Sequence, residues 1–149
     1  MTTLAYDGNM ICVDSQATAG EIVTPRKFQK AFYDVGEYLV VMFAGSTAHY
    51  APMLEWLREG ADPKEHKDWE CAAWGVKADG SVLRYVGPYP EVVDGIDADG
   101  TGAGFAIGAM AAGATALEAV RIASQYDLYT GVTVRVFYIP KTKAEDLAA

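Results

Sequence analysis

Alternating or continuous runs of apolar residues predict a series of short β-strands along the chain. The predicted strands cover residues 4–6, 10–13, 32–35, 38–43, 71–76, 82–86 and 132–139. Asp7-Gly8 and Asp79-Gly80 are turn signals that join neighbouring strands into hairpins. Residues 38–43 are apolar throughout, which is typical of a strand buried on both faces. We expect loops at residues 14–20 and 87–90.

A helix is predicted to follow Gly45 and to end at Gly60, because apolar residues recur there at the helical spacing. These apolar positions are Tyr50, Met53, Leu54 and Leu57. Ser46 or Thr47 can accept hydrogen bonds from the free N–H groups at the helix start. Pro52 is compatible only with the first turn of a helix, so the regular helix is expected to begin close to it.

Two further helices are predicted at residues 105–112 and 115–125, separated by Gly113. The first consists largely of Ala and Gly, which lets another backbone approach closely. The chain therefore runs through several strands, a helix, a hairpin, two helices and a last strand. This order favours an α+β fold with antiparallel sheets over a doubly wound α/β fold.

The composition is that of a single acidic domain, predicted to cover residues 1–149 with a polar tail at 141–149. With 51% hydrophobic residues the chain can form its own core. A net charge of -8 leaves no basic surface for nucleic acid. No signal peptide opens the sequence, and the most apolar stretch, 102–116, is shorter than the ~20 residues of a membrane span. We therefore expect a cytoplasmic protein without nucleic-acid or membrane partners.

Several familiar kinds of site are not supported by the spacing of the residues that they need. The stretch from Gly100 to Gly104 resembles a phosphate loop, but Phe105 stands where a dinucleotide fingerprint has its third glycine, and no GK[ST] follows. The potential metal ligands lack close spacing, and no G-x-S-x-G motif is present. These potential ligands are Cys12, His49, His66 and Cys71. We expect no cofactor and no metal, and reduced core thiols at both cysteines.

The amino terminus offers a different chemistry. Removal of Met1 would leave Thr2 with a hydroxyl group and a free α-amine on adjacent carbons. An α-amine has a reference pKa of ~7.7–8.0, so near neutral pH it can accept the hydroxyl proton. One residue would then supply both nucleophile and base. A retained Met1 would block the amine.

Five segments in order resemble proteasome β subunits and the bacterial peptidase HslV. The first segment is the opening of the chain, which carries Thr2-Thr3 at its start and the Asp14-x-x-x-Thr18 pattern after the second strand. The others are Lys30 before a strand, Phe43-Ala44-Gly45 before the first helix, Gly100-Thr101-Gly102 before the helix pair, and Asp127-Leu128-Tyr129-Thr130-Gly131 before the last strand. The resemblance covers nearly the whole chain, and it is greater to the short proteasome-like proteins of some phages and bacteria than to a full-length HslV.

The resemblance implies a role for each matching residue. Thr2 would be the nucleophile, Lys30 would lower the proton affinity of the amine, and Asp14 would pair with Lys30. Thr101 would match a serine of the family, while Asp127 and Thr130 would hydrogen-bond the amine. Other interpretations remain open at this point. Lys27 could be the matching lysine, Asp14 and Thr101 could be loop or helix caps, and Asp127 could be a surface acid.

The resemblance also implies the αββα sandwich of N-terminal nucleophile hydrolases. It implies a ring of identical subunits whose internal chamber receives peptides or unfolded proteins, with any ATP-driven unfolding supplied by a separate ATPase. The family has a second long helix after the first, whereas residues 61–70 are mostly charged or polar, so one outer layer is expected to lack a helix. By motif position, the oxyanion donor is expected to be the backbone N–H of Met42.

Two other functions keep the same fold. An inactive member could serve as a ring or scaffold protein, and a small-molecule amidase could use the same nucleophile on another substrate.

Overall fold

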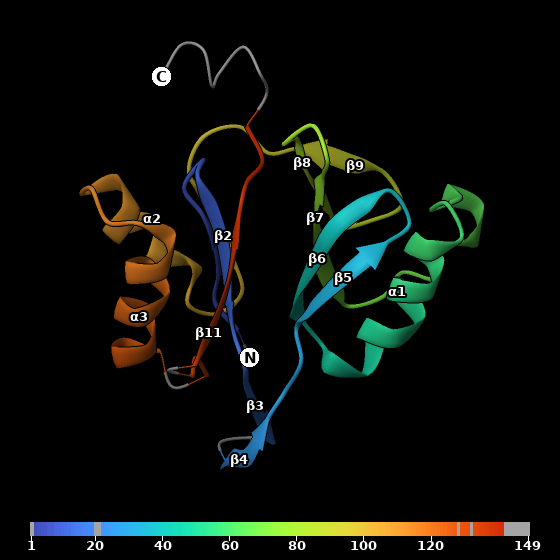
Figure 1. Cartoon of the computed structure of the whole chain (residues 1–149). Helices are drawn as coiled ribbons and strands as arrows, with labels where there is room; N and C mark the ends of the chain where they lie inside the picture. Colours follow the sequence, from blue (N-terminus) through green and yellow to red (C-terminus); the bar gives the residue numbers. More distant parts are fainter. Residues whose placement is uncertain (1, 20–21, 128, 132, 142–149) are drawn as a thin grey trace.

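The computed structural model describes residues 2–19, 22–127, 129–131 and 133–141, with backbone alone at 17–19 and 22–27. Two antiparallel sheets lie face to face between outer helices, so that the chain forms four layers (Figure 1). The predicted α+β fold with antiparallel sheets is confirmed. Of the predicted tail at 141–149, all but Lys141 lies outside the described residues.

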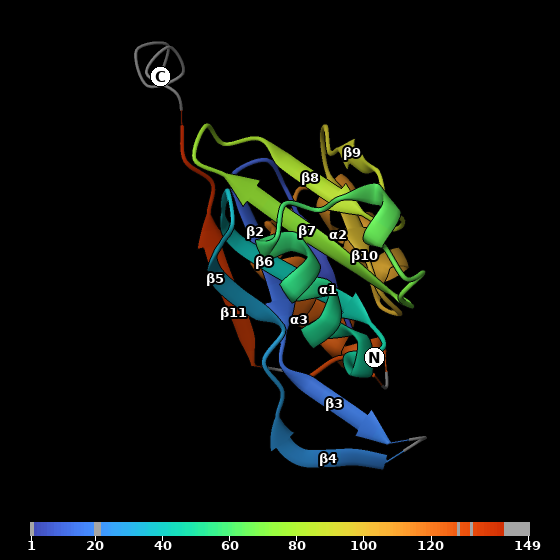
Figure 2. The same cartoon turned by 90° about the vertical axis from the view of Figure 1, so that its right-hand side faces the viewer.

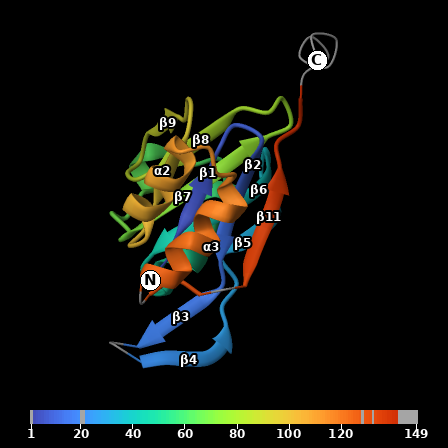
Figure 3. The ribbon, with the colours of Figure 1, turned by 90° about the vertical axis from the view of Figure 1, so that its left-hand side faces the viewer.

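The first sheet contains the two ends of the chain. Its spatial order is β10 (Asp97–Asp99), β1 (Leu4–Tyr6), β2 (Met10–Asp14) and β11 (Val134–Tyr138). Helices α2 (Ala103–Ala111) and α3 (Ala116–Tyr126) cover its outer face (Figure 3). A capping box between Thr115 and Glu118 begins α3, and Ala119, Val120 and Ala123 are buried against the sheet.

The second sheet is built around the longest strand. Its spatial order is β5 (Ala31–Val35), β6 (Tyr38–Gly45), β7 (Cys71–Lys77), β8 (Val82–Tyr85) and β9 (Pro90–Val92). Helix α1 (Tyr50–Arg58) covers its outer face (Figure 2). Between the two sheets, Leu4 and Ile11 of the first pack with Val40 and Trp74 of the second in one fully buried cluster.

Helix α1 has the predicted buried face, but its start differs from the expectation. The segment Thr47–His49 is a short 3-10 turn (η1), and Pro52 falls in the first turn of α1 as expected. The side chain of Ser46 makes no capping hydrogen bond. Gly60 follows the helix with φ +101°, a conformation that glycine adopts without strain.

No long helix lies between α1 and β7, where every residue is described, so the expected thin outer layer is confirmed. The segment contains only the 3-10 turn η2 (Pro63–Glu65). In place of a helix, the loop packs on Trp56. The Nε1 of Trp56 donates to the Asp62 carbonyl at 2.7 Å, and His66 and Trp69 meet its ring at 4.9 and 5.9 Å between centroids.

The expectation of a loop at residues 14–20 is wrong. Strands β3 (Gln16–Ala19) and β4 (Ile22–Lys27) form a separate two-stranded sheet that projects beyond the main body (Figures 2 and 3). The short strands β9 and β10 were also not predicted. Acidic residues disfavour strands, and β10 is held by specific partners: Arg84 binds Asp97 at 3.2 Å, and Trp74 donates to Asp99 at 3.1 Å.

Candidate active site

Thr2 precedes a central strand of the first sheet and is fully buried in the full-length chain. The turn after β10 fixes its backbone, because Gly102 N–H donates to the Thr2 carbonyl at 3.2 Å. Gly100 has φ +92°, and a Cβ at this residue would collide with the Thr2 carbonyl. A Cβ at Gly102 would collide with the Thr3 hydroxyl. Both glycines are therefore required for the close approach of this turn to the amino-terminal strand.

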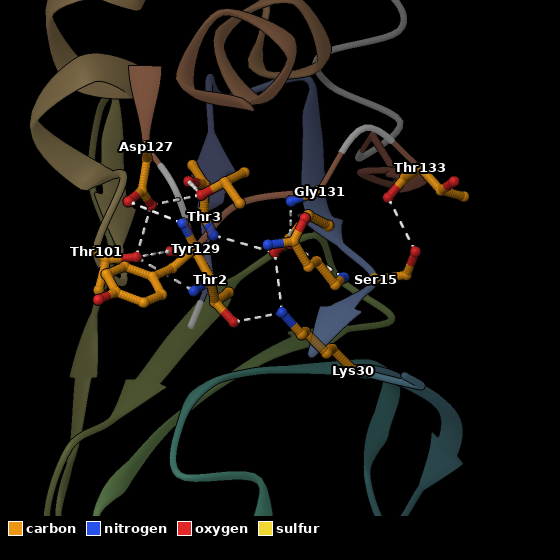
Figure 4. A network of polar contacts seen from close by, with 12 residues as sticks. Thr2, Thr3, Ser15, Lys30, Thr101, Asp127, Tyr129, Gly131 and Thr133 are labelled. Atoms are coloured by element: carbon orange, nitrogen blue, oxygen red, sulfur yellow. Dashed lines mark hydrogen bonds and ion pairs between the residues drawn. The ribbon is translucent and has the colours of Figure 1, made fainter. Parts of the chain in front are cut away.

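A buried ion pair contacts the Thr2 hydroxyl (Figure 4). Lys30, which precedes β5, places its Nζ 2.6 Å from Thr2 Oγ1 and 3.1 Å from Asp14 Oδ1. Lys30 is 1% exposed and Asp14 is 0% exposed. Burial lowers the pKa of Lys30 below its ordinary value, while the neighbouring Asp14 carboxylate opposes that change.

Asp14, at the end of β2, is also satisfied by backbone donors. Its Oδ1 accepts from Thr3 N–H at 3.1 Å, and its Oδ2 accepts from Gln16 at 3.2 Å and from Gly131 at 2.8 Å. These backbone donors, together with Lys30, satisfy the oxygens of the buried carboxylate. Asp14 thereby ties β2 to the segment before β11 and holds Lys30 against Thr2.

A second cluster of polar residues lies at the Thr2 backbone nitrogen (Figure 4). The nitrogen is 3.4 Å from Thr101 Oγ1, which donates to Asp127 Oδ2 at 2.6 Å. Thr130 Oγ1 donates to the same oxygen at 2.6 Å, and it also lies 2.6 Å from Thr3 Oγ1. Burial disfavours the Asp127 charge, but the hydrogen bonds from Thr101 and Thr130 outweigh it and hold the pKa of Asp127 below its ordinary value.

The expected oxyanion donor, Met42, is in the wrong place. It lies inside β6 with Ala31 and Trp74 as its partners on the two sides, and its side chain belongs to the core between the sheets. A strand with neighbours on both sides directs its N–H groups into the ladders of the sheet. The amide of Met42 therefore points away from a carbonyl bound at Thr2.

Gly45, the last residue of β6, is better placed to donate. Amide directions alternate along a strand, so its N–H points to the same side as that of Phe43, which donates to the Lys30 carbonyl at 2.9 Å. The described pairing of β5 with β6 starts with Ala31 opposite Met42. It includes no partner in β5 for Gly45. The donor thus lies at the open end of the strand beside Lys30.

The structure brings together the predicted residues Thr2, Asp14, Lys30, Thr101, Asp127 and Thr130. The side chain of Lys27, the alternative lysine, lies outside the described residues. Sequence reasoning missed Thr3 and Gly131, which complete the two clusters. Both directly follow a residue that was singled out, and this proximity is the signal that could have identified them.

An apolar pocket of about 440 Å³ lies beside this site. Its lining residues are Phe28, Gln29, Phe32, Thr47, Tyr50, Ala51 and Leu54. Tyr50 connects the pocket to the end of β6, because its hydroxyl donates to the Gly45 carbonyl at 3.3 Å. The arrangement therefore joins a hydroxyl group held by a cation to a space that suits an apolar side chain.

No protein-family model and no curated protein matches the sequence. The structure is similar to eukaryotic HslV from Trypanosoma brucei, with a TM-score of 0.71, 25% identity, and coverage of 93% of this chain and 98% of that chain. It is also similar to BPH from Thiobacillus denitrificans, solved alone and in complex with epoxomicin, with a TM-score of 0.71. That alignment has 16% identity and covers 95% of this chain and 98% of BPH, and it supports the fold alone.

Three observations agree. They are the fold, the match to HslV over nearly the full length of both chains, and the residues gathered at Thr2. The chain has an α+β fold that matches HslV and the proteasome-like N-terminal nucleophile hydrolases, and this likeness supports an HslV/proteasome β-subunit-like family.

Proposed function

We propose that the protein is a threonine-type peptidase in which Thr2, freed by removal of Met1, attacks peptide carbonyls. The observation that carries this proposal is the 2.6 Å contact between the Lys30 ammonium and Thr2 Oγ1, supported by the buried Asp14 carboxylate. A buried cation is costly unless it is paired, and here Lys30 is paired with Asp14 and also donates to the Thr2 hydroxyl oxygen. Such an arrangement activates a nucleophile.

The proposed reaction proceeds through an ester. The α-amine of Thr2 takes the hydroxyl proton as Oγ1 bonds to the substrate carbonyl carbon, and Gly45 N–H donates to the oxygen that becomes negative. The new ammonium then gives its proton to the leaving amine as the peptide C–N bond breaks. In the second stage, the amine takes a proton from water, whose oxygen attacks the ester and releases Thr2.

The surrounding residues are proposed to lower the proton affinity of the amine and to fix its orientation. The positive charge of Lys30 lowers the proton affinity of the nearby amine, so that more of it is free base near neutral pH. Thr101 holds the Thr2 nitrogen and is itself held by Asp127, which also accepts from Thr130. We propose that these residues keep the amine lone pair directed at Oγ1.

The substrate, in this proposal, is a peptide or unfolded segment with an apolar residue next to the cleaved bond. The apolar pocket of about 440 Å³ beside Tyr50 would hold that side chain. The subunit is proposed to assemble into a ring in the cytoplasm, with unfolding supplied by a separate ATPase. Among the described residues, no helix has the length and apolar character that crossing a membrane requires.

Two measurements test the peptidase proposal. Intact mass of the purified protein is expected to show loss of Met1, which frees the α-amine of Thr2. Fluorogenic peptides with apolar, acidic and basic residues before the cleaved bond are then compared, and the apolar peptide is expected to be cleaved fastest. Thr2→Ala should abolish turnover, and Thr2→Ser should retain part of it. Equal cleavage by wild type and Thr2→Ala would contradict the proposal.

A further inference from the structure

The chain contains two histidines, and both accept a hydrogen bond from the backbone of the segment that joins α1 to β7. His49, the last residue of η1, accepts with its Nδ1 from the Glu70 N–H at 2.8 Å. His66 accepts with its Nδ1 from the Asp68 N–H at 3.0 Å. An imidazole nitrogen accepts only while it carries no proton, so both contacts require the uncharged form of the side chain.

The contact made by His49 fixes the end of β6. Ser46 N–H donates to the Glu70 carbonyl at 2.8 Å, so Glu70 is bound through both its amide and its carbonyl to the residues that follow Gly45. Gly45 itself pairs with Cys71, and a Cβ at Gly45 would lie only 2.8 Å from the Glu70 carbonyl oxygen. Residues 70–71 are therefore packed directly against Gly45.

A cavity of about 290 Å³ connects this segment to the candidate active site. Trp69 and Glu70 line one part of it, and Gly45 and Gly100 line another part. Gly100 belongs to the turn that approaches the Thr2 carbonyl closely. A shift of residues 69–70 would therefore change the space beside Thr2.

We propose that His49 and His66 form an acid-sensitive clamp on residues 66–70, which is closed while both side chains are neutral and is released when they bind protons. A proton on Nδ1 turns the acceptor into a donor that faces another N–H group, so the hydrogen bond is lost. Histidine has an ordinary pKa of about 6.5, which places this change close to neutral pH.

The surroundings of His66 disfavour its charged form. Its side chain is 2% exposed and packs on Trp56 and Trp69, at 4.9 and 4.8 Å between ring centroids. Its Nε2 is buried and has no hydrogen-bond partner among the residues that the structure describes. Burial lowers the pKa of His66 below its ordinary value, and the exposed Asp68 carboxylate, 3.9 Å from Nδ1, opposes that change only in part.

The lowered pKa of His66 gives the direction of the pH effect. As the pH falls, the released segment binds the proton before the closed one does. The contribution of His66 to the clamp is therefore complete above the ordinary value of 6.5 and is lost as the pH falls through the folded pKa. At His49, no carboxylate of the described residues forms an ion pair with the imidazole.

Hydrogen–deuterium exchange of the full-length protein, followed by mass spectrometry, tests the clamp without any need for activity. Protection of residues 46–50 and 66–71 is corrected for the intrinsic exchange rate at each pH. It is expected to fall about tenfold between pH 7.5 and 5.5 for each histidine that is neutral only in the closed clamp. Helix α3 should keep its protection. Unchanged protection of the two segments, or an equal fall in α3, would overturn the proposal.

The matched variant carries His49→Asn and His66→Asn, because the Asn Oδ1 can replace Nδ1 as acceptor and does not titrate. Its two segments should show the same protection at pH 7.5 and 5.5, and a fall as large as in the wild type would refute the clamp. His49→Asn alone leaves the packing of His66 on Trp56 intact, and it should flatten the response of residues 46–50. A wild-type response in that single variant would exclude His49 from the clamp.

Release of the clamp is expected to lower peptide cleavage, and this consequence rests on the proposed function. The apolar fluorogenic peptide is used after removal of Met1 is verified by mass. The α-amine of Thr2 titrates in the wild type and in the double variant alike, so the ratio of their kcat/KM values cancels that effect. The ratio of variant to wild type should rise severalfold from pH 7.5 to 5.5, and a constant ratio would contradict the effect on cleavage. Wild-type protein without Thr2-dependent turnover would instead overturn the proposed function, and the exchange experiment would still decide the clamp.

Discussion

At the scale of the residue, Asp14 shows how a charge is kept in the interior. The Lys30 ammonium and the N–H groups of Thr3, Gln16 and Gly131 converge on its two oxygens. The resemblance to proteasome β subunits and HslV implied that Asp14 and Lys30 would pair. It could not predict the backbone donors, because these depend on the path of the loops and not on residue type. The same limit explains the error at Met42, since motif position gives no amide direction.

Asp14→Asn is expected to destabilise the protein by roughly 3–5 kcal/mol, because the buried Lys30 loses the charge that compensates it. Urea unfolding followed by tryptophan fluorescence measures this difference. Glu55→Gln is the matched control. It breaks the exposed pair with Arg58, whose side chains are 48% and 59% exposed, so its effect should stay near zero. Equal losses of stability in both variants would show that the buried ion pair contributes no more to the free energy of unfolding than the exposed pair.

Asp127 gives a prediction for acid. Its folded pKa lies below the ordinary value of 3.8, so the unfolded state binds a proton first as the pH falls. The stability that ionised Asp127 contributes is therefore present above that ordinary value and is lost as the pH falls through the folded pKa. The gap in thermal midpoint between wild type and Asp127→Asn should be widest near pH 7 and should close as the pH falls below 3.8 and through the folded pKa. A gap that is constant over this range would contradict the assignment.

At the scale of the element, the sequence predicted correctly those helices and strands that have a strong apolar pattern. It missed short strands that have a weak one. Helix α3 has a capping box and a clear apolar face, and β6 is a long apolar run; both lie where the sequence predicted them. The short strands β9 and β10 have little strand propensity of their own, with β10 consisting of Asp-Ala-Asp. They exist because neighbouring strands supply hydrogen bonds, which is tertiary information that a local pattern does not contain.

The turn between β10 and α2 provides a paired test. Gly100→Ala should impair both stability and peptide cleavage, because the residue has φ +92° and its new Cβ would displace the Thr2 carbonyl. Gly104→Ala, only a few residues away in α2, meets nothing within 4 Å and should be neutral or stabilising by up to about 1 kcal/mol. Thermal midpoints and kcat of the two variants are compared, and similar behaviour would refute the role of the turn.

At the scale of the whole molecule, one helix covers the second sheet where two cover the first. The aromatic residues Trp56, His66 and Trp69 fill part of the space on that side, so the core stays closed despite the thin layer. Apolar side chains are nevertheless exposed elsewhere, among them Phe105 at 45% and Ile107 at 39% on α2. These exposed side chains are candidates for the contacts between subunits that the proposed ring requires.

Native mass spectrometry is therefore expected to show a species at a multiple of the 16.0 kDa subunit mass. The measurement is made at low and moderate salt, because apolar contacts should persist when surface charges are screened. A monomer at every concentration tested would contradict the ring assembly. Such a result would leave the chemistry at Thr2 to be judged by the cleavage assays alone.

The spread of the site along the sequence has a consequence for when the protein can first act. The hydroxyl comes from residue 2, the ammonium from residue 30, and the group that holds the nitrogen from residues 101, 127 and 130. A chain still emerging from the ribosome has the nucleophile from its first moments but lacks its partners until most of the polypeptide has been made. If the proposed peptidase activity holds, the site would be incomplete during synthesis, and a nascent or truncated chain would not cut its neighbours.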